Sequence, residues 1–258
     1  GRPFAREHRH AADDQRQLLV AALEVLVGKR WLKDFLSGTS LEQFAAALTA
    51  IFSSKPVFIT GTAGTGKSYT LRTFLALLPD SVKVAVVAPT GIAALNAGGV
   101  TIHSLFQLPF GGFLPDNSAP DFSESTKFET KATLRRHFKM SGLKKSVIRN
   151  MELLIIDEVS MLRADLLDAM DFMMQTVRKK NSPFGGVQVL FIGDLLQLPP
   201  VIRDDEWRTL KNYYKGKFFF HSQVVQQNPP LYIELDKIFR QTDDAFISVL
   251  NNLRNNQI

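Results

Sequence analysis

Short, largely apolar runs rich in β-branched residues alternate along this chain with helical or irregular segments. Runs without a polar face are typical of parallel strands that are buried on both sides, rather than of half-exposed strands. Five runs are predicted as strands: Val57–Thr60, Val84–Ala88, Leu153–Ile156, Val187–Ile192 and Leu231–Leu235. The alternation predicts an α/β fold with an open, mainly parallel sheet, helices on both faces, and a ligand at the carboxyl ends of the strands.

The pattern outside these strands divides the chain. A first helix is predicted after Asp13, and a second helix, over Ser40–Phe52, begins with a capping box. The stretch 108–150 breaks the rhythm, because it opens rich in glycine and proline and continues as a basic segment. We therefore expect a helical extension over 1–39 with no assigned role, and one large domain over 40–258 that contains a small insertion.

Length and composition narrow the class of protein. The 258 residues suffice for one large α/β domain, and the lack of cysteine excludes disulfides, thiolate catalysis and cysteine-ligated zinc. A net charge of +6 favours a polyanionic partner. No apolar stretch approaches the roughly 20 residues of a membrane span, and the N-terminal run lacks the apolar core of a secretory signal. We expect no membrane association and no secretion, but a cytoplasmic or nuclear location.

The segment Gly61–Ser68 carries the most specific chemistry so far. It fits the phosphate-loop pattern G-x-x-x-x-G-K-[ST], directly after a predicted strand and before a helix predicted over Tyr69–Leu78. Backbone N–H groups of such a loop wrap phosphates, Lys67 supplies a charge to the β and γ phosphates, and the Ser68 hydroxyl ligates Mg²⁺. We therefore predict binding of ATP with Mg²⁺. The predicted nucleotide-binding residues in this segment are Gly61, Thr62, Ala63, Gly64, Thr65, Gly66, Lys67, Ser68 and Tyr69.

Two carboxylates follow the predicted strand Leu153–Ile156. Asp157 is placed to hold the metal through its coordination shell, and Glu158 to orient or deprotonate an attacking water. An acidic pair at a strand end is more often a helix cap or a solvated turn when it stands alone. With a phosphate loop upstream, we predict Asp157 as a metal ligand and Glu158 as a catalytic residue.

Gln197 lies in a turn rich in glycine and proline after the strand Val187–Ile192. Its amide can donate to the γ-phosphate and accept from the attacking water, so its position can report loss of that phosphate. From the residues alone, a polar side chain that satisfies the backbone of a tight loop is an equally good interpretation.

Two further segments, Ala88–Asn96 and Gly99–Ser104, indicate a resemblance to one protein family. Together with the segments above they closely resemble the Pif1 family of superfamily 1 DNA helicases, and the match runs from about Leu41 to the C-terminus. The PTGIAA and TIHS elements are far more diagnostic than the phosphate loop. The resemblance implies a RecA-like fold and a 5′-to-3′ translocase that acts on single-stranded and forked DNA. It also implies a location in the bacterial nucleoid or the eukaryotic nucleus, and we expect a monomer.

The resemblance also assigns roles to residues. In that family the residue at Gln43 reads the adenine, although a capping box explains Gln43 equally well. Gln197 couples the γ-phosphate to DNA, and Arg240, in a segment that resembles the FRQ motif, approaches the γ-phosphate. The implied catalytic residues are Lys67, Glu158, Gln197 and Arg240. The implied DNA-binding residues are Pro89, Thr90, Gly91, Thr101, His103, Ser104 and Phe106.

Some of these DNA contacts also have a rationale in the residues themselves. The hydroxyls of Thr90, Thr101 and Ser104 can bind phosphates, and the rings of His103 and Phe106 can stack on bases. The alternative is an ordinary buried helix start, in which a lone histidine is a core residue.

The basic stretch Lys127–Arg149 has two interpretations of equal weight. Its positive side chains can track phosphates, or they can form a solvated helix face. In the family, a small domain inserted at this place helps to separate the strands. The charged residues concerned are Arg135, Arg136, Lys139, Lys144 and Lys145.

Family members carry a second RecA-like domain, whose motifs do not follow Arg254 in this sequence. We therefore expect these 258 residues to bind nucleotide, to hydrolyse it slowly if at all, and not to unwind DNA alone. Two alternatives remain from other classes. One is a phosphate-loop ATPase that does not act on nucleic acid, and the other is a non-catalytic module that binds nucleic acid.

Overall fold

The structure is a computed structural model, and it describes residues 55–62, 64–78, 81–116, 128–137 and 140–235. All of them belong to the second of two compact units, Ala46–Ile258. The helices predicted after Asp13 and over Ser40–Phe52 lie outside the described residues.

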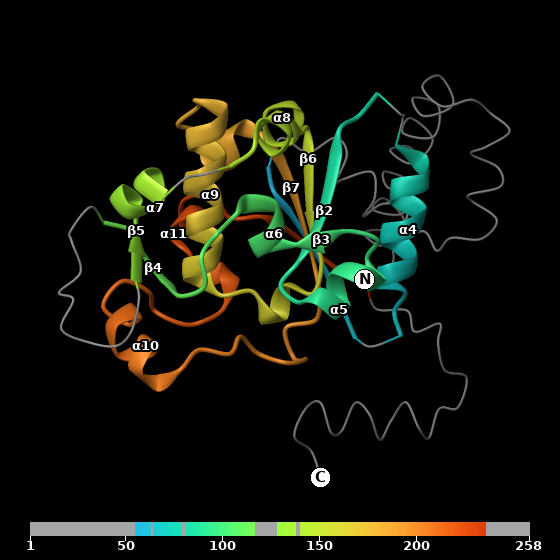
Figure 1. Ribbon diagram of the computed structural model, residues 1–258. Helices are drawn as coiled ribbons and strands as arrows, with labels where there is room; N and C mark the ends of the chain where they lie inside the picture. Colours follow the sequence, from blue (N-terminus) through green and yellow to red (C-terminus); the bar gives the residue numbers. More distant parts are fainter. Residues whose placement is uncertain (1–54, 63, 79–80, 117–127, 138–139, 236–258) are drawn as a thin grey trace, which may run out of the picture. The chain divides into compact units, whose positions relative to one another are not determined.

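A parallel sheet of six strands forms the centre of the described part, in the order β3-β2-β6-β7-β1-β8 (Figure 1). The five predicted strands are present, and the RecA-like α/β fold is confirmed. The sixth strand, β3, has two residues, too few for a hydrophobic pattern to reveal. The strands are β1 (Val57–Gly61), β2 (Val84–Ala88), β3 (Val100–Thr101), β6 (Leu153–Ile156), β7 (Gln188–Ile192) and β8 (Leu231–Leu235).

Alternate residues of each central strand enter two separate cores, because successive side chains of a strand point to opposite faces. In β1, Val57 and Ile59 pack in one core together with Leu71 and Phe74 of α4. Phe58, between them in sequence, belongs to the other core, which contains side chains of α6, α9 and α11. Figure 1 shows α4 on one side of the sheet and α9 on the other. Burial on both faces is the physical reason for the uninterrupted apolar runs.

The helices connect the parallel strands, since such strands require crossover connections. Helix α4 corresponds to the helix predicted over Tyr69–Leu78 and begins two residues earlier, at Lys67. The α-helices are α4 (Lys67–Leu77), α5 (Gly91–Asn96), α6 (Ile102–Phe106), α7 (Lys131–His137), α8 (Gly142–Asn150), α9 (Ala164–Arg178), α10 (Asp204–Leu210) and α11 (Gln223–Gln227). Short 3₁₀ helices are η1 (Val159–Met161), η2 (Pro183–Gly186) and η3 (Phe219–His221).

The stretch 108–150, predicted as an insertion, contains its own small sheet between α6 and β6. Strands β4 (Gly112–Leu114) and β5 (Phe128–Thr130) pair in parallel, and α7 and α8 follow them. The backbone of β4 is fixed to the main domain, because Phe113 N–H donates to the buried carboxylate of Asp165 at 3.0 Å. In the described part of the chain no helix is both long and apolar enough to cross a membrane.

Candidate nucleotide and DNA site

The phosphate loop begins where β1 ends and closes at the first turn of α4. Gly66 precedes the helix in the left-handed region, with φ of 83°, which favours glycine. Gly61 is needed for a different reason, since a Cβ there would lie 2.6 Å from Thr65 Oγ1 and 2.7 Å from the carbonyl oxygen of Leu235 in the neighbouring strand β8. The sequence thus builds a tight turn with its backbone N–H groups at a helix N-terminus.

Lys67 donates from its ammonium group to two carbonyl oxygens of its own loop. The distances are 2.8 Å to Gly61 O and 3.0 Å to Thr62 O. The positive charge is therefore held across the loop, within reach of any phosphate that the loop wraps.

Threonine hydroxyls brace the same loop. Thr65 is fully buried and donates to Thr62 O at 2.9 Å, and Thr70 donates to Gly66 O at 3.0 Å. The buried Oγ1 of Thr62 has no hydrogen-bond partner in the structure. A buried polar atom of this kind requires an explanation, and a bound polar ligand in the loop supplies one. Ser68 and Tyr69 are exposed at the start of α4.

Asp157 and Glu158 follow β6 and turn sharply at its carboxyl end. Glu158 has φ of 52° and ψ of 45°, a left-handed conformation that is uncommon for residues other than glycine and occurs at functional sites. Its N–H donates to Asp157 Oδ1 at 2.9 Å. Burial raises the pKa of Asp157 to about 6, an effect that this N–H and the charge of Lys67 partly oppose.

A cavity of about 320 Å³ brings the two predicted halves of the nucleotide site together. It lies between α4, α5 and the end of β6, and Ser68, Asp157 and Glu158 all line it. Arg72 and Asn96 line it as well, and the sequence analysis did not single them out. The predicted metal ligands, Ser68 and Asp157, thus share one cavity with the predicted catalytic Glu158.

Gln197 is exposed in a turn after β7, and its side chain is held by Asp194. The amide Nε2 of Gln197 lies 3.4 Å from Asp194 Oδ2, and Asp194 Oδ1 accepts the N–H of Leu196 at 3.1 Å. Asp194 is 2% exposed. Sequence reasoning missed it, although the signal was present: Asp194 follows β7 much as Asp157 follows the adjacent strand β6.

Thr90 and Thr101 are helix N-caps. Thr90 Oγ1 accepts the N–H of Ala93 at the start of α5, and Thr101 Oγ1 accepts that of Ser104 at the start of α6. The hydroxyl hydrogen of each threonine is not used by the cap, so it can still donate to a phosphate. Pro89 is half-buried and Gly91 exposed in front of α5.

The two rings predicted to stack on bases have different environments. Phe106 is fully buried in the main core, so its ring is not accessible to a base, and that prediction is corrected. Phe106 shares the buried face of α6 with Ile102 and Leu105. His103 is half-buried and stacks on Phe110, with ring centroids 4.9 Å apart. Burial, and secondarily the charge of Arg163, lower the pKa of His103.

The basic stretch is partly engaged within the protein. Lys144 donates to the carbonyl oxygen of Ser104 at 2.7 Å, which joins α8 to α6. The guanidinium of Arg135 lies over the Phe172 ring, 4.9 Å from its centroid, and Arg136 is exposed. These contacts add structural roles to two of the cations named from the sequence. Lys139 lies outside the described residues.

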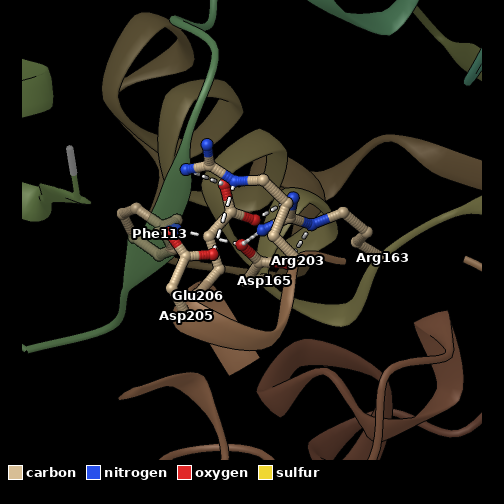
Figure 2. Close-up of polar contacts among 6 residues, drawn as sticks. All are labelled: Phe113, Arg163, Asp165, Arg203, Asp205 and Glu206. Carbon is tan, nitrogen blue, oxygen red and sulfur yellow. Dashed lines mark hydrogen bonds and ion pairs between the residues drawn. The ribbon is translucent and has the colours of Figure 1, made fainter. Parts of the chain in front are cut away.

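A network of charges joins the inserted segment to the main domain, as Figure 2 shows. Arg163 binds Asp165 through two nitrogens, at 2.9 and 2.8 Å, and Glu206 through a third, at 2.9 Å. Asp165 also accepts the N–H of Phe113 in β4, and exposed Arg203 lies 3.4 Å from Glu206. Sequence reasoning did not find this network, since it joins three segments, around Phe113, Arg163 and Glu206, that lie far apart in the chain.

Three predicted site residues lie outside the described residues: Gln43, Ala63 and Arg240. Their roles remain predictions.

Comparisons with known proteins identify relatives of this chain. The profile of the PIF1-like helicases matches residues 41–258. The chain is 36% identical over 213 residues to the ATP-dependent DNA helicase PIF1 of Homo sapiens. It is 40% identical over 202 residues to that of Saccharomyces cerevisiae strain YJM789. These matches cover 83% and 77% of this chain but 29% and 21% of the relatives, so the chain spans less than a third of their length.

Solved structures show the same relationship. The chain resembles the Pif1 helicase from Bacteroides in complex with ADP-AlF3 and single-stranded DNA, with 42% identity and a TM-score of 0.73. It also resembles a structure of two coordinating Pif1 helicases at forked double-stranded DNA, with 41% identity and a TM-score of 0.75. Each match covers 85% of this chain, and 47% and 49% of the respective relatives.

Proposed function

This chain belongs to the PIF1-like helicase family, and from that premise we propose that it is the ATP-binding and single-stranded-DNA-binding motor domain of a 5′-to-3′ DNA helicase. The observation that carries the proposal is the cavity at the carboxyl ends of the strands, where Ser68 of the phosphate loop meets Asp157 and Glu158. Open α/β sheets bind ligands at this edge.

ATP is held by the phosphate loop, and Ser68 and Asp157 are the residues that would hold Mg²⁺. The donor set fits this ion, because Mg²⁺ prefers oxygen ligands and takes few of them from the protein when phosphates supply the rest. Among the described residues, no group of three or more acidic, histidine or cysteine side chains forms a self-sufficient metal site. The cation would neutralise the β and γ phosphates and the buried carboxylate of Asp157.

Hydrolysis would then depend on side chains that surround the γ-phosphate. Glu158 orients and deprotonates the attacking water, and Lys67 leaves its loop carbonyls to bind the phosphates. Gln197, fixed by Asp194, is the group that senses the γ-phosphate, and Arg240 stabilises the charge that develops during transfer. The remaining residues assigned to the nucleotide are Gln43, which would read the adenine, and Tyr69.

DNA binding is proposed for the face formed by the starts of α5 and α6. Thr90 and Thr101 offer hydroxyl hydrogens, Ser104 offers an exposed hydroxyl, and His103 offers a ring. Pro89 and Gly91 would contact the same strand, whereas Phe106 is excluded by its burial. The proposed partners are single-stranded and forked DNA, bound by a monomer, and such a partner places the protein in the bacterial nucleoid or the nucleus.

The test is ATP hydrolysis by the full-length protein with and without single-stranded DNA. We expect DNA to stimulate phosphate release, and Lys67→Ala to abolish it at any DNA concentration. Lys211→Ala, at an exposed lysine directly after α10, is the matched control and should behave as the unmodified protein.

Two results would overturn the proposal. If single-stranded DNA neither binds nor stimulates hydrolysis, the protein is an ATPase that does not act on nucleic acid. If Lys67→Ala leaves ATP binding and turnover unchanged, the phosphate loop is structural and the chain is a binding module.

A further inference from the structure

Another cavity, of about 270 Å³, lies on the face that carries α6, away from the phosphate loop. Its walls come from the main domain and from the inserted stretch 108–150. His103 and Gln107 lie at α6 and Met173 on α9 of the main domain, whereas Glu129 on β5 and Leu134 on α7 belong to the insertion. The nucleotide does not use any of these residues in the proposed function. The cavity is smaller than the roughly 300–1,000 Å³ of pockets that take drug-sized ligands, and this favours a single planar ring system over a whole nucleotide.

One member of an aromatic pair lines this cavity. His103 lines it and stacks on Phe110, with an angle of 22° between the ring planes. Phe110 is 85% exposed. An exposed phenylalanine ring is in contact with water, which is unfavourable for an apolar surface. Stacking of another ring on it removes that surface from water and is therefore favourable. The pair therefore offers a platform of the type that binds unpaired bases.

The chemistry of the walls matches a nucleobase. Leu108, Leu134 and Met173 are buried and supply apolar surface for the faces of a ring. Gln107 and Glu129 supply oxygen atoms that accept hydrogen bonds. Carboxylate oxygens accept from the exocyclic amine of cytosine, and adenine and guanine carry similar amines, whereas thymine has none.

The walls are held in place before any ligand binds. The loop before β4 is anchored by Phe113 N–H, which donates to Asp165, and Asp165 is fixed in turn by Arg163 (Figure 2). At the other end, Gln107 Nε2 donates to Ser104 O at 3.2 Å, and Lys144 donates to the same oxygen. A rigid cavity loses little entropy when a ring enters it.

We propose that this cavity receives one nucleobase of the single-stranded DNA, turned out of the strand and stacked against the pair His103 and Phe110. The inference rests on the proposed function, because α6 is the segment along which the strand is proposed to run. Glu129 accepts from the exocyclic amine of the base, so the cavity prefers cytosine, adenine or guanine to thymine.

The experiment uses the full-length protein and oligothymidine strands that carry one 2-aminopurine at successive positions. This fluorescent base has an exocyclic amine, and its emission reports stacking. We expect emission to change at one position of the bound strand and not at its neighbours. Phe110→Ala should remove that difference, and should weaken binding of the strand about 5- to 150-fold, the range for loss of one stacked base.

Two further variants sharpen the experiment. Val201→Ala truncates a side chain of similar exposure, 80%, that neither lines the cavity nor stacks on His103, and it should leave emission and affinity unchanged. Glu129→Gln keeps the shape of the wall but removes the carboxylate. It should reduce the preference for a single cytosine over thymine, expected at about fivefold for the unmodified protein.

The possible outcomes distinguish the proposed base cavity from the proposed helicase function on which it rests. If the strand binds but every position of 2-aminopurine responds alike, or if Phe110→Ala keeps the position-specific signal, the base cavity is wrong while the helicase proposal stands. If the strand does not bind at all, both are wrong.

Discussion

The backbone N–H of Glu158 donates to Asp157 Oδ1 at 2.9 Å, across a peptide in which Glu158 has a left-handed conformation. The bond occupies one oxygen of Asp157 and leaves the other as the candidate metal ligand. It also fixes the direction of the Glu158 side chain relative to that carboxylate. A strained turn of this kind persists when the surrounding structure requires it, and here it separates the proposed metal ligand Asp157 from the proposed base Glu158.

Glu158→Gln is therefore expected to stop hydrolysis while ATP still binds. The amide keeps the shape of the side chain but cannot accept a proton from water, so phosphate release should fall about 10²- to 10⁴-fold. Binding of a fluorescent ATP analogue should change little. Glu152→Gln is the matched control, because Glu152 is exposed just before the opposite end of β6. A hydrolysis rate near that of the control would remove Glu158 from the mechanism.

Asp194→Ala is expected to uncouple ATP hydrolysis from the binding of single-stranded DNA. The buried carboxylate holds both the Leu196 N–H and the Gln197 side chain, so its loss frees the turn that carries Gln197. Basal hydrolysis should persist while stimulation by single-stranded DNA falls. The free energy of unfolding should drop by about 1.5–3 kcal/mol, the usual contribution of a hydrogen bond to a charged group. Full stimulation in this variant would show that Gln197 does not need Asp194.

The buried carboxyl group of Asp168 is expected to make the stability of the fold depend on pH. Burial raises its pKa to about 6, although its carboxylate accepts the N–H groups of Gln223 and Val224 at the start of α11. Because the folded pKa lies above the usual 3.8, the stability that this group contributes is present below about pH 4 and lost as the pH rises to about 6. The loss amounts to about 3 kcal/mol at most.

Urea unfolding between pH 4 and 7 checks the sign. Asp168→Asn does not titrate, so the variant should gain stability relative to the unmodified protein as the pH rises through this window. A constant difference between the two proteins would mean that the pKa of Asp168 is not raised.

The sequence predicted those features of the structure that depend only on residues close together in the chain. Continuous apolar runs located the long strands, and the glycine spacing from Gly61 to Gly66 located the phosphate loop. The sequence could not reveal that Phe106 faces the core while His103, three residues earlier, faces a cavity, because that depends on which elements pack around α6. The pairing of Arg163 with Glu206 is tertiary for the same reason.

The two arginines of this network, Arg163 and Arg203, differ in their environments. Arg163 lies between Asp165 and Glu206, whose side chains are 2% and 9% exposed, whereas the side chain of Arg203 is 64% exposed. Arg163→Met leaves the buried carboxylate of Asp165 without its cation and Glu206 with only the exposed Arg203, so the free energy of unfolding should fall by about 3–5 kcal/mol. Arg203→Ala should cost about 1 kcal/mol or less, because solvent screens its ion pairs.

Urea unfolding of both variants at one pH separates the two cases. Because Asp165 also holds Phe113 in β4, Arg163→Met should in addition disturb the loop that carries Phe110 and weaken binding of single-stranded DNA. Equal stabilities of the two variants would mean that the buried carboxylates take protons instead of requiring Arg163. The attachment of β4 to the main domain would then not depend on a charge.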